Sequence, residues 1–195
     1  MSEIKKRWLI EGVAGTGKSS LIAQLKAQLK SASRKGKVFD EGQTFGELLE
    51  ELKTHPSPEA HFWRMEQVMQ ALAGSLNLDY LILERFHPSY YVQFPLAEHF
   101  SRFDRQLAAW GFEFVLLDLP DQAFAERSLY CPEREAEGWS AGNIAWYGSE
   151  QKAIEAFQNS QARRREYANL SKMKVRILDT SAQNWLIYAK DLLDA

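Results

Sequence analysis

A glycine-rich segment near the N-terminus says more about the fold of this chain than any other part of its sequence. An apolar run, Trp8 to Ile10, leads into Gly12, four further residues and then Gly17-Lys18-Ser19, and a stretch with helical spacing follows. Between a strand and a helix, this pattern is typical of a loop whose backbone N–H groups hold phosphate. The expected binding residues of this loop are Gly12, Val13, Ala14, Gly15, Thr16, Gly17, Lys18, Ser19 and Ser20.

Two side chains of this loop have chemistry of their own. The Lys18 ammonium is expected to reach the β and γ oxygens of a triphosphate. The Ser19 hydroxyl is expected to bind Mg²⁺, which bridges the same oxygens and offsets the charge that develops during transfer. ATP and Mg²⁺ are therefore the expected cofactors, and Lys18 is the first expected catalytic residue.

Apolar runs recur along the chain and are separated by longer stretches with helical spacing. They lie at Trp8 to Ile10, Val38-Phe39, Tyr80 to Leu83, Phe114 to Leu119 and Val175 to Leu178. This alternation predicts an α/β fold with a parallel sheet flanked by helices. A chain of 195 residues is long enough for one core, so residues 1–195 are expected to form a single domain.

Three stretches between the runs are specific enough to interpret. Lys18 to Ser31 carries leucines four residues apart, which predicts a helix packed on the sheet. Ser57-Pro58-Glu59 predicts a helix start, and the apolar stripe that follows continues to about Leu76. Arg134 to Gly148 holds three glycines without a clear period, which predicts a mobile loop.

The composition indicates what kind of partner to expect. The formal net charge is -2, so no overall positive field attracts nucleic acid or an anionic membrane. Cys131 is the only cysteine, which excludes an internal disulfide and fits a reducing compartment. The first apolar run is too short for a secretory or membrane-spanning segment. We therefore expect a small-molecule partner and a cytoplasmic location, with neither nucleic acid nor membrane bound.

Four segments resemble the thymidylate kinase and deoxynucleoside kinase group. Glu11-Gly12 ahead of Gly15, Gly17, Lys18 and Ser19 resembles its phosphate loop, and Glu84-Arg85-Phe86 is similar to the acid–arginine pair after its third strand. Asp40-Glu41-Gly42 resembles the segment with a substrate-facing glutamate, and Arg127 with Pro132 to Glu135 looks like the arginine-bearing lid. The resemblance spans most of the chain, and the phosphate loop is its one individually specific motif.

The resemblance implies a three-layer P-loop nucleotide kinase fold with a five-stranded parallel sheet and a lid at about 127–150. It also implies a kinase that is able to form a homodimer. Two departures concern the acceptor: Ala14 stands where thymidylate kinases usually carry an aspartate, and Glu41 lacks the proline that normally follows it. The acceptor's identity therefore stays open.

Two side chains that follow the third apolar run have expected roles at the site. Glu84 ends a strand at the ligand-binding edge of the sheet and is expected to hold Mg²⁺ through water. A plain strand-end carboxylate is the alternative, and Asp118 competes for the metal role. Arg85 is expected to pair with substrate phosphate or with Glu41, and a structural salt bridge is the alternative.

Three further residues belong to the expected chemistry. Glu41 is the candidate base for a hydroxyl acceptor. If the acceptor is already a phosphate monoester, no base is needed, and Glu41 orients the substrate instead. Arg134 is expected to stabilise the transferring phosphoryl group, with Arg127 as a weaker candidate that also suits a surface ion pair.

The acceptor pocket is the least determined part of the sequence. Trp63, Gln67 and Phe86 are the expected substrate-binding residues beside Glu41 and Arg85, and Tyr90 is a further candidate for this pocket. Aromatic residues at such spacings also suit a core. The three arginines 163–165 suggest a solvated helix face, although one of them could face the phosphates.

Taken together, the residues favour ATP- and Mg²⁺-dependent phosphoryl transfer to a nucleoside, a nucleoside monophosphate or a similar small molecule. One alternative is a P-loop NTPase or switch without a small-molecule acceptor. Another is a kinase of a non-nucleoside alcohol. The sequence lacks an Asn-Lys-x-Asp guanine-reading segment, which argues against a GTP-specific switch.

Overall fold

The fold is built on one parallel β-sheet. The computed structural model describes residues 5–44, 58–94 and 97–194. Within them the strands are β1 (Lys6–Glu11), β2 (Gly36–Phe39), β3 (Tyr80–Glu84), β4 (Glu113–Asp118) and β5 (Lys174–Asp179). They lie in the order β2-β3-β1-β4-β5, and every neighbouring pair is parallel. The predicted five-stranded α/β fold is confirmed.

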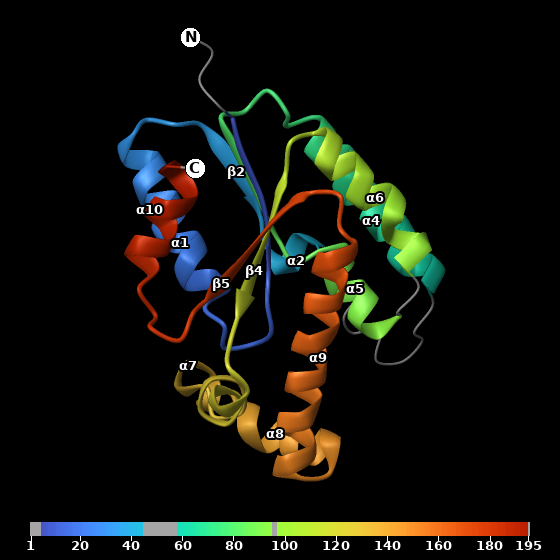
Figure 1. The fold of residues 1–195 in the computed structure, drawn as a ribbon, viewed down its shortest axis with the longest axis vertical. Coiled ribbons are helices and arrows are strands. Elements are labelled where there is room, and N and C mark those ends of the chain that lie inside the picture. The colour runs from blue at the N-terminus through green and yellow to red at the C-terminus, as the bar shows by residue number, and fades with distance from the viewer. Residues whose placement is uncertain (1–4, 45–57, 95–96, 195) are drawn as a thin grey trace.

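Helices cover both faces of this sheet (Figure 1). The described ones are α1 (Lys18–Ser31), α2 (Glu41–Thr44), α4 (Pro58–Ala73), α5 (His87–Gln93), α6 (Ala97–Ala109), α7 (Pro132–Glu135), α8 (Trp139–Tyr147), α9 (Glu150–Leu170) and α10 (Trp185–Asp194). A 3-10 turn, η1 (Asp121–Ala123), and a π-helix, η2 (Ala125–Leu129), follow β4. Helices α1 and α10 lie side by side on one face, and α4, α5, α6 and α9 cover the other.

Successive side chains of a strand point to opposite faces of the sheet, and each face has its own hydrophobic core under its own helices. Leu9 of β1 joins the core under α4, α5 and α6, whereas its neighbours Trp8 and Ile10 join the core under α1 and α10. All five residues of β3 are buried, as expected for a central strand of a parallel sheet covered on both faces. A third cluster, which includes Val13 and Phe157, packs the phosphate loop against η2 and α9.

Two predicted helices are confirmed, and one predicted loop is helical instead. Helix α1 spans Lys18–Ser31 as expected, and α4 begins at Pro58 and ends at Ala73, close to the predicted end. The proposed cap Ser57 lies outside the described residues. The prediction of a loop from Arg134 to Gly148 was wrong, because α7 and α8 occupy most of it. Gly138 and Gly148 have left-handed backbones and cap α8 at its start and its end, so two of the three glycines in this segment mark the ends of a helix.

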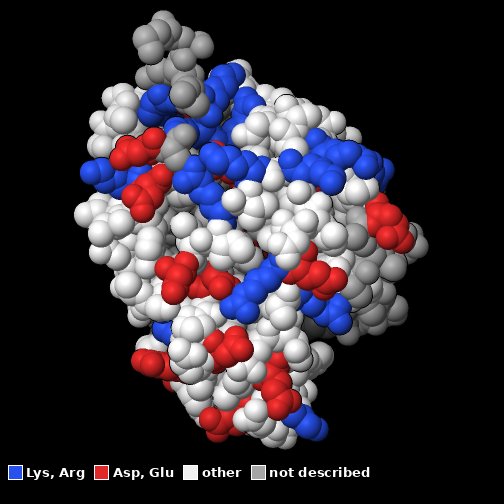
Figure 2. Space-filling model, viewed as in Figure 1, with Lys and Arg blue, Asp and Glu red and all other residues white. Residues whose placement is uncertain are grey.

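The carboxyl ends of the strands face the segment that contains α7 and α8. This segment lies beyond the sheet, in the lower part of Figure 1, and α9 runs from it back along the sheet. On the face shown in Figure 2, Lys and Arg side chains gather mainly in the upper half, away from α7 and α8. Among the described residues, no helix combines the length and apolarity that crossing a membrane requires.

Candidate functional site

The phosphate loop is shaped by close approaches that leave no room for side chains. Gly15 has φ +79°, and a Cβ there would lie 1.7 Å from the carbonyl oxygen of Arg127 in η2. Gly17 has φ +90°, and a Cβ there would lie 1.9 Å from the Trp185 ring of α10. Both glycines therefore permit a left-handed backbone and the contact of the loop with segments late in the chain.

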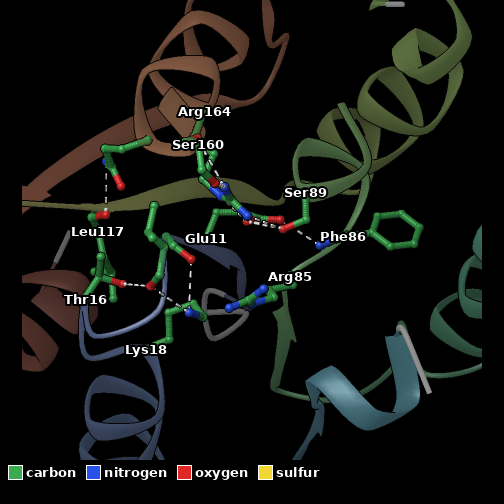
Figure 3. A network of polar contacts seen from close by, with 12 residues as sticks. Glu11, Thr16, Lys18, Arg85, Phe86, Ser89, Leu117, Ser160 and Arg164 are labelled. Atoms are coloured by element: carbon green, nitrogen blue, oxygen red, sulfur yellow. Dashed lines mark hydrogen bonds and ion pairs between the residues drawn. The ribbon is translucent and has the colours of Figure 1, made fainter. Parts of the chain in front are cut away.

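Lys18 is buried at the mouth of this loop. Its Nζ donates to the carbonyl oxygens of Gly12 at 3.0 Å and Val13 at 3.1 Å (Figure 3). Burial, assisted by the positive charge of Arg85, lowers the pKa of Lys18 to about 7. In the described structure its hydrogen-bond acceptors are backbone carbonyls and not carboxylates, so a bound phosphate would favour the protonated, charged form of Lys18.

A cavity of about 500 Å³ opens beside Lys18 at the carboxyl edge of the sheet. It brings together segments from the whole length of the chain: the phosphate loop, the ends of β2 and β3, η2, α7 and the start of α10. Its lining comprises Ala14, Gly15, Gly17, Lys18, Ser19, Ser20, Glu41, Glu84, Arg85, Glu126, Arg127, Cys131, Pro132, Arg134, Gln183 and Trp185. All four expected catalytic residues, Lys18, Glu41, Arg85 and Arg134, are in this lining.

Glu84 and Arg85 enter the cavity from the end of β3. Burial raises the pKa of Glu84, while the nearby Lys18 and Arg85 charges oppose that rise. Arg85 has φ +55°, an uncommon backbone for a residue with a side chain, and its N–H donates to Ile10 O at 3.0 Å. Its Nε lies 3.4 Å from a carboxylate oxygen of Glu41. The predicted pairing of Arg85 with Glu41 is therefore present.

The η2–α7 segment is attached directly to the phosphate loop. Arg127 donates to Gly15 O at 2.8 Å and to Thr180 O at 3.3 Å, and Ser128 Oγ donates to Ala14 O at 2.7 Å. Arg127 thus joins the loops that follow β1 and β5, which the sequence did not indicate. The Arg134 guanidinium lies over the Trp139 ring at 3.5 Å, a cation–π contact that fixes it beside the cavity.

A buried network that the sequence analysis missed underlies this site. Glu11, at the end of β1, is fully buried and accepts hydrogen bonds from Phe86 N, Ser89 Oγ and Arg164 Nε (Figure 3). Arg164 was expected on a solvated face, which is wrong, because only 4% of its side chain is exposed. A signal was available: Arg164 falls in register with the other buried residues of α9, which are Ala153, Phe157, Gln161, Tyr167 and Ala168.

Asp118, the rival candidate for the metal role, has other partners. Arg165 donates to its two carboxylate oxygens at 2.8 and 3.0 Å, and Gln161 donates to one of them as well. Asp118 is absent from the cavity lining, whereas Glu84 is present. Of the two strand-end acids, Glu84 is the one positioned beside the phosphate loop.

Two solved structures share this architecture over almost their whole length. One is the YorR protein from Bacillus subtilis, solved in complex with phosphorylated GDP, which is 20% identical in sequence to this chain with a TM-score of 0.64. The match covers 97% of this chain and 94% of that one. Deoxyadenosine kinase from M. mycoides, solved with bound dATP, is 14% identical with a TM-score of 0.59, covering 96% and 99%. The chain has the fold of P-loop kinases. No protein-family model and no curated protein sequence matches it.

The cavity also offers two side-chain oxygen ligands of the kind that suits Mg²⁺. Ser19 and Glu84 line the same cavity, and oxygen ligands are those that Mg²⁺ prefers. Within residues 5–44, 58–94 and 97–194, no group of three or more His, Cys, Asp or Glu side chains is arranged to hold a metal ion. A metal held by one or two protein oxygens and by substrate phosphates is the arrangement that these residues fit.

The other expected substrate-binding residues of this P-loop kinase fold do not line the cavity beside Lys18. Trp63 of α4 is 62% exposed, and Gln67, one turn further on, is exposed as well. Phe86 and Tyr90 are fully buried in the core under α4, α5 and α6, so the core alternative holds for these two rings. Substrate contact by Trp63 and Gln67 stays a prediction.

Proposed function

We propose that this chain transfers a phosphoryl group from ATP, with Mg²⁺, to a nucleoside, a nucleoside monophosphate or a similar small molecule. The observation that carries the proposal is the convergence of Lys18, Arg85, Arg134 and Glu84 on one cavity with the phosphate loop. Phosphoryl transfer needs positioning and positive charge more than covalent chemistry from the protein, and this cavity offers both. The nucleotides in the two similar structures also support a nucleotide ligand.

The roles of the cavity residues follow from their positions. The backbone N–H groups of the loop and Lys18 hold the triphosphate, and Arg134 stabilises charge on the transferring group. Mg²⁺, held by Ser19 and, through water, by Glu84, would neutralise charge on the β and γ oxygens. Residues 127–150 form the lid in this proposal, and Arg127 ties its start to the loop that it covers.

The role of Glu41 depends on the acceptor. An alcohol must lose a proton as it attacks phosphorus, and Glu41 is the cavity carboxylate available beside Arg85. A phosphate monoester is already an anion and needs no base, so Glu41 would then orient the substrate beside Arg85.

The test is a transfer assay with γ-labelled ATP, Mg²⁺ and a panel of nucleosides, nucleoside monophosphates and small alcohols. We expect label to appear in one acceptor class and to be lost in Lys18→Ala. Lys26→Ala is the matched control, because Lys26 lies exposed on the same helix, away from the cavity. ATP binding with slow hydrolysis across the whole panel would instead favour a nucleotide-dependent switch.

A further inference from the structure

A second cavity lies next to the phosphate cavity. It has a volume of about 410 Å³ and is lined by residues of α5 and α9, with Arg85 and Tyr147 at its borders. Arg85 also lines the phosphate cavity, so one guanidinium belongs to both walls. In Figure 3 the Arg85 side chain points toward Lys18, and Ser89 and Arg164 lie above it in this view. The second cavity is therefore placed to present a molecule to the phosphate loop.

The charged side chains that line this second cavity are all positive. Three arginines, Arg85, Arg163 and Arg164, line the cavity together with Ser89, Val92, Gln93, Tyr147, Ala156, Asn159 and Ser160, and no acid is among these residues. Arg164 is paired with Glu11, and Arg85 lies near Glu41. Arg163 has no carboxylate within ion-pair distance in the described part of the chain. A half-buried guanidinium without a counter-ion favours an anionic ligand.

The neutral members of the lining suit the rest of such a ligand. Gln93 and Asn159 offer amide donors and acceptors that can read polar edges. The Tyr147 side chain, partly exposed at the border, offers an aromatic ring to a flat base. This combination of positive charge, amides and one aromatic ring suits a nucleotide better than an uncharged nucleoside or a simple alcohol.

Resting on the proposed function, we propose that the acceptor is a nucleoside monophosphate bound in this second cavity, with its phosphate held by Arg85 and Arg163. In the reaction, an oxygen of that phosphate forms a bond to the γ-phosphorus of ATP, and the bond from this phosphorus to the β–γ bridging oxygen breaks. The products are a nucleoside diphosphate and ADP. The attacking oxygen is already an anion, so no proton is transferred to the protein.

The experiment measures binding of the acceptor apart from catalysis. The protein is first saturated with Mg²⁺ and a non-hydrolysable ATP analogue, which fills the phosphate loop. The common ribo- and deoxyribonucleoside 5′-monophosphates and the matching nucleosides are then titrated by calorimetry into the wild type, Arg163→Gln, Arg163→Lys and Lys152→Gln. Lys152→Gln removes one positive charge from an exposed position of the same helix, outside the cavity, and serves as the control.

We expect at least one monophosphate to bind more tightly than its nucleoside. Its Kd should rise about ten- to hundredfold in Arg163→Gln, as for loss of a charged hydrogen bond, and much less in Arg163→Lys and Lys152→Gln. Equal affinity for nucleoside and monophosphate, or an unchanged Kd in Arg163→Gln, would overturn the inference. So would an absence of binding by the whole panel. The binding of the ATP analogue, and label transfer to a nucleoside, would show separately whether the proposed function survives.

Discussion

Arg164 of α9 and Glu11 of β1 form a buried ion pair, with Nε of Arg164 3.1 Å from an Oε of Glu11. The two residues are 153 positions apart in the chain, so this pair fixes the helix that follows α8 against the strand that enters the phosphate loop. Arg164 also donates to Ser89 Oγ, which itself donates to Glu11. Arg164 therefore contacts Glu11 both directly and through Ser89, and it is the cation paired with this buried carboxylate.

Removing one partner of this pair should be costly. We predict that Arg164→Ala lowers the free energy of unfolding by about 3–5 kcal/mol, because Glu11 would be left as a buried charge without its counter-ion. Arg163→Ala, its neighbour without a carboxylate partner in the described structure, should change stability by less than about 0.5 kcal/mol. Urea unfolding of the two variants makes the comparison, and equal effects would show that the pair does not stabilise the fold.

The phosphate-loop glycines should tolerate no side chain. In Gly15→Ala the new Cβ would meet the Arg127 carbonyl, and the left-handed backbone alone costs about 1–2 kcal/mol. We predict a loss of both stability and ATP binding, measured by thermal unfolding and calorimetry. Gly142→Ala within α8 is the control, since no atom lies within 4 Å of a Cβ there, and it should be neutral or slightly stabilising. Normal ATP binding by Gly15→Ala would contradict the close approach.

The lowered pKa of Lys18 predicts proton uptake on nucleotide binding. In the empty site its pKa is about 7, so the amine is mostly neutral at pH 8; triphosphate charge would raise this pKa and draw in a proton. We expect uptake of nearly one proton per ATP at pH 8 and little at pH 6, measured by calorimetry in buffers of different ionisation enthalpy.

Lys18→Arg is the control for this titration, because a guanidinium stays charged throughout the range. Uptake at pH 8 should disappear in this variant, and equal uptake in both proteins would assign the proton to another group. The same pKa shift also affects stability. Between pH 10.5 and about 7 the unfolded chain binds a proton at Lys18 that the folded protein does not, so the free energy of unfolding of the empty protein falls as the pH is lowered through this range.

Arg127 should affect nucleotide affinity through the loops that it joins. Without its bonds to Gly15 O and Thr180 O, the phosphate loop and the loop after β5 lose a shared partner. We predict that Arg127→Lys raises the Kd for MgATP about tenfold, measured by calorimetry. The exposed Arg102, which pairs with Glu66 on the surface, provides the matched control Arg102→Lys. If the two substitutions behave alike, Arg127 is a surface residue without influence on the site.

The sequence predicted those parts of this molecule that depend on local pattern. Apolar runs and a glycine motif located the strands, helix α1 and the phosphate loop, because burial and backbone freedom act on neighbouring residues. Lys18, Glu41, Arg85 and Arg134 follow or lie in such local features, and all four line the cavity.

What the sequence did not predict depends on contacts across the chain. The burial of Arg164 requires Glu11, far away in sequence, and its helical register was hidden by two adjacent arginines. The helix α8 was mistaken for a loop because glycines flank it and its apolar residues show no clear period. The aromatic residues Phe86 and Tyr90 were candidates for both core and pocket, and only the three-dimensional packing distinguishes the two.

The most direct test of phosphoryl transfer follows ATP, ADP, inorganic phosphate and the acceptor together by ³¹P NMR in one sample. The sample holds the protein, MgATP and the best-bound acceptor, and Lys18→Ala serves as the reference. We expect the new acceptor signal to grow in step with ADP, with little inorganic phosphate, and to be absent with Lys18→Ala. Growth of inorganic phosphate in step with ADP, without an acceptor signal, would show a nucleotide hydrolase and contradict the proposed transfer.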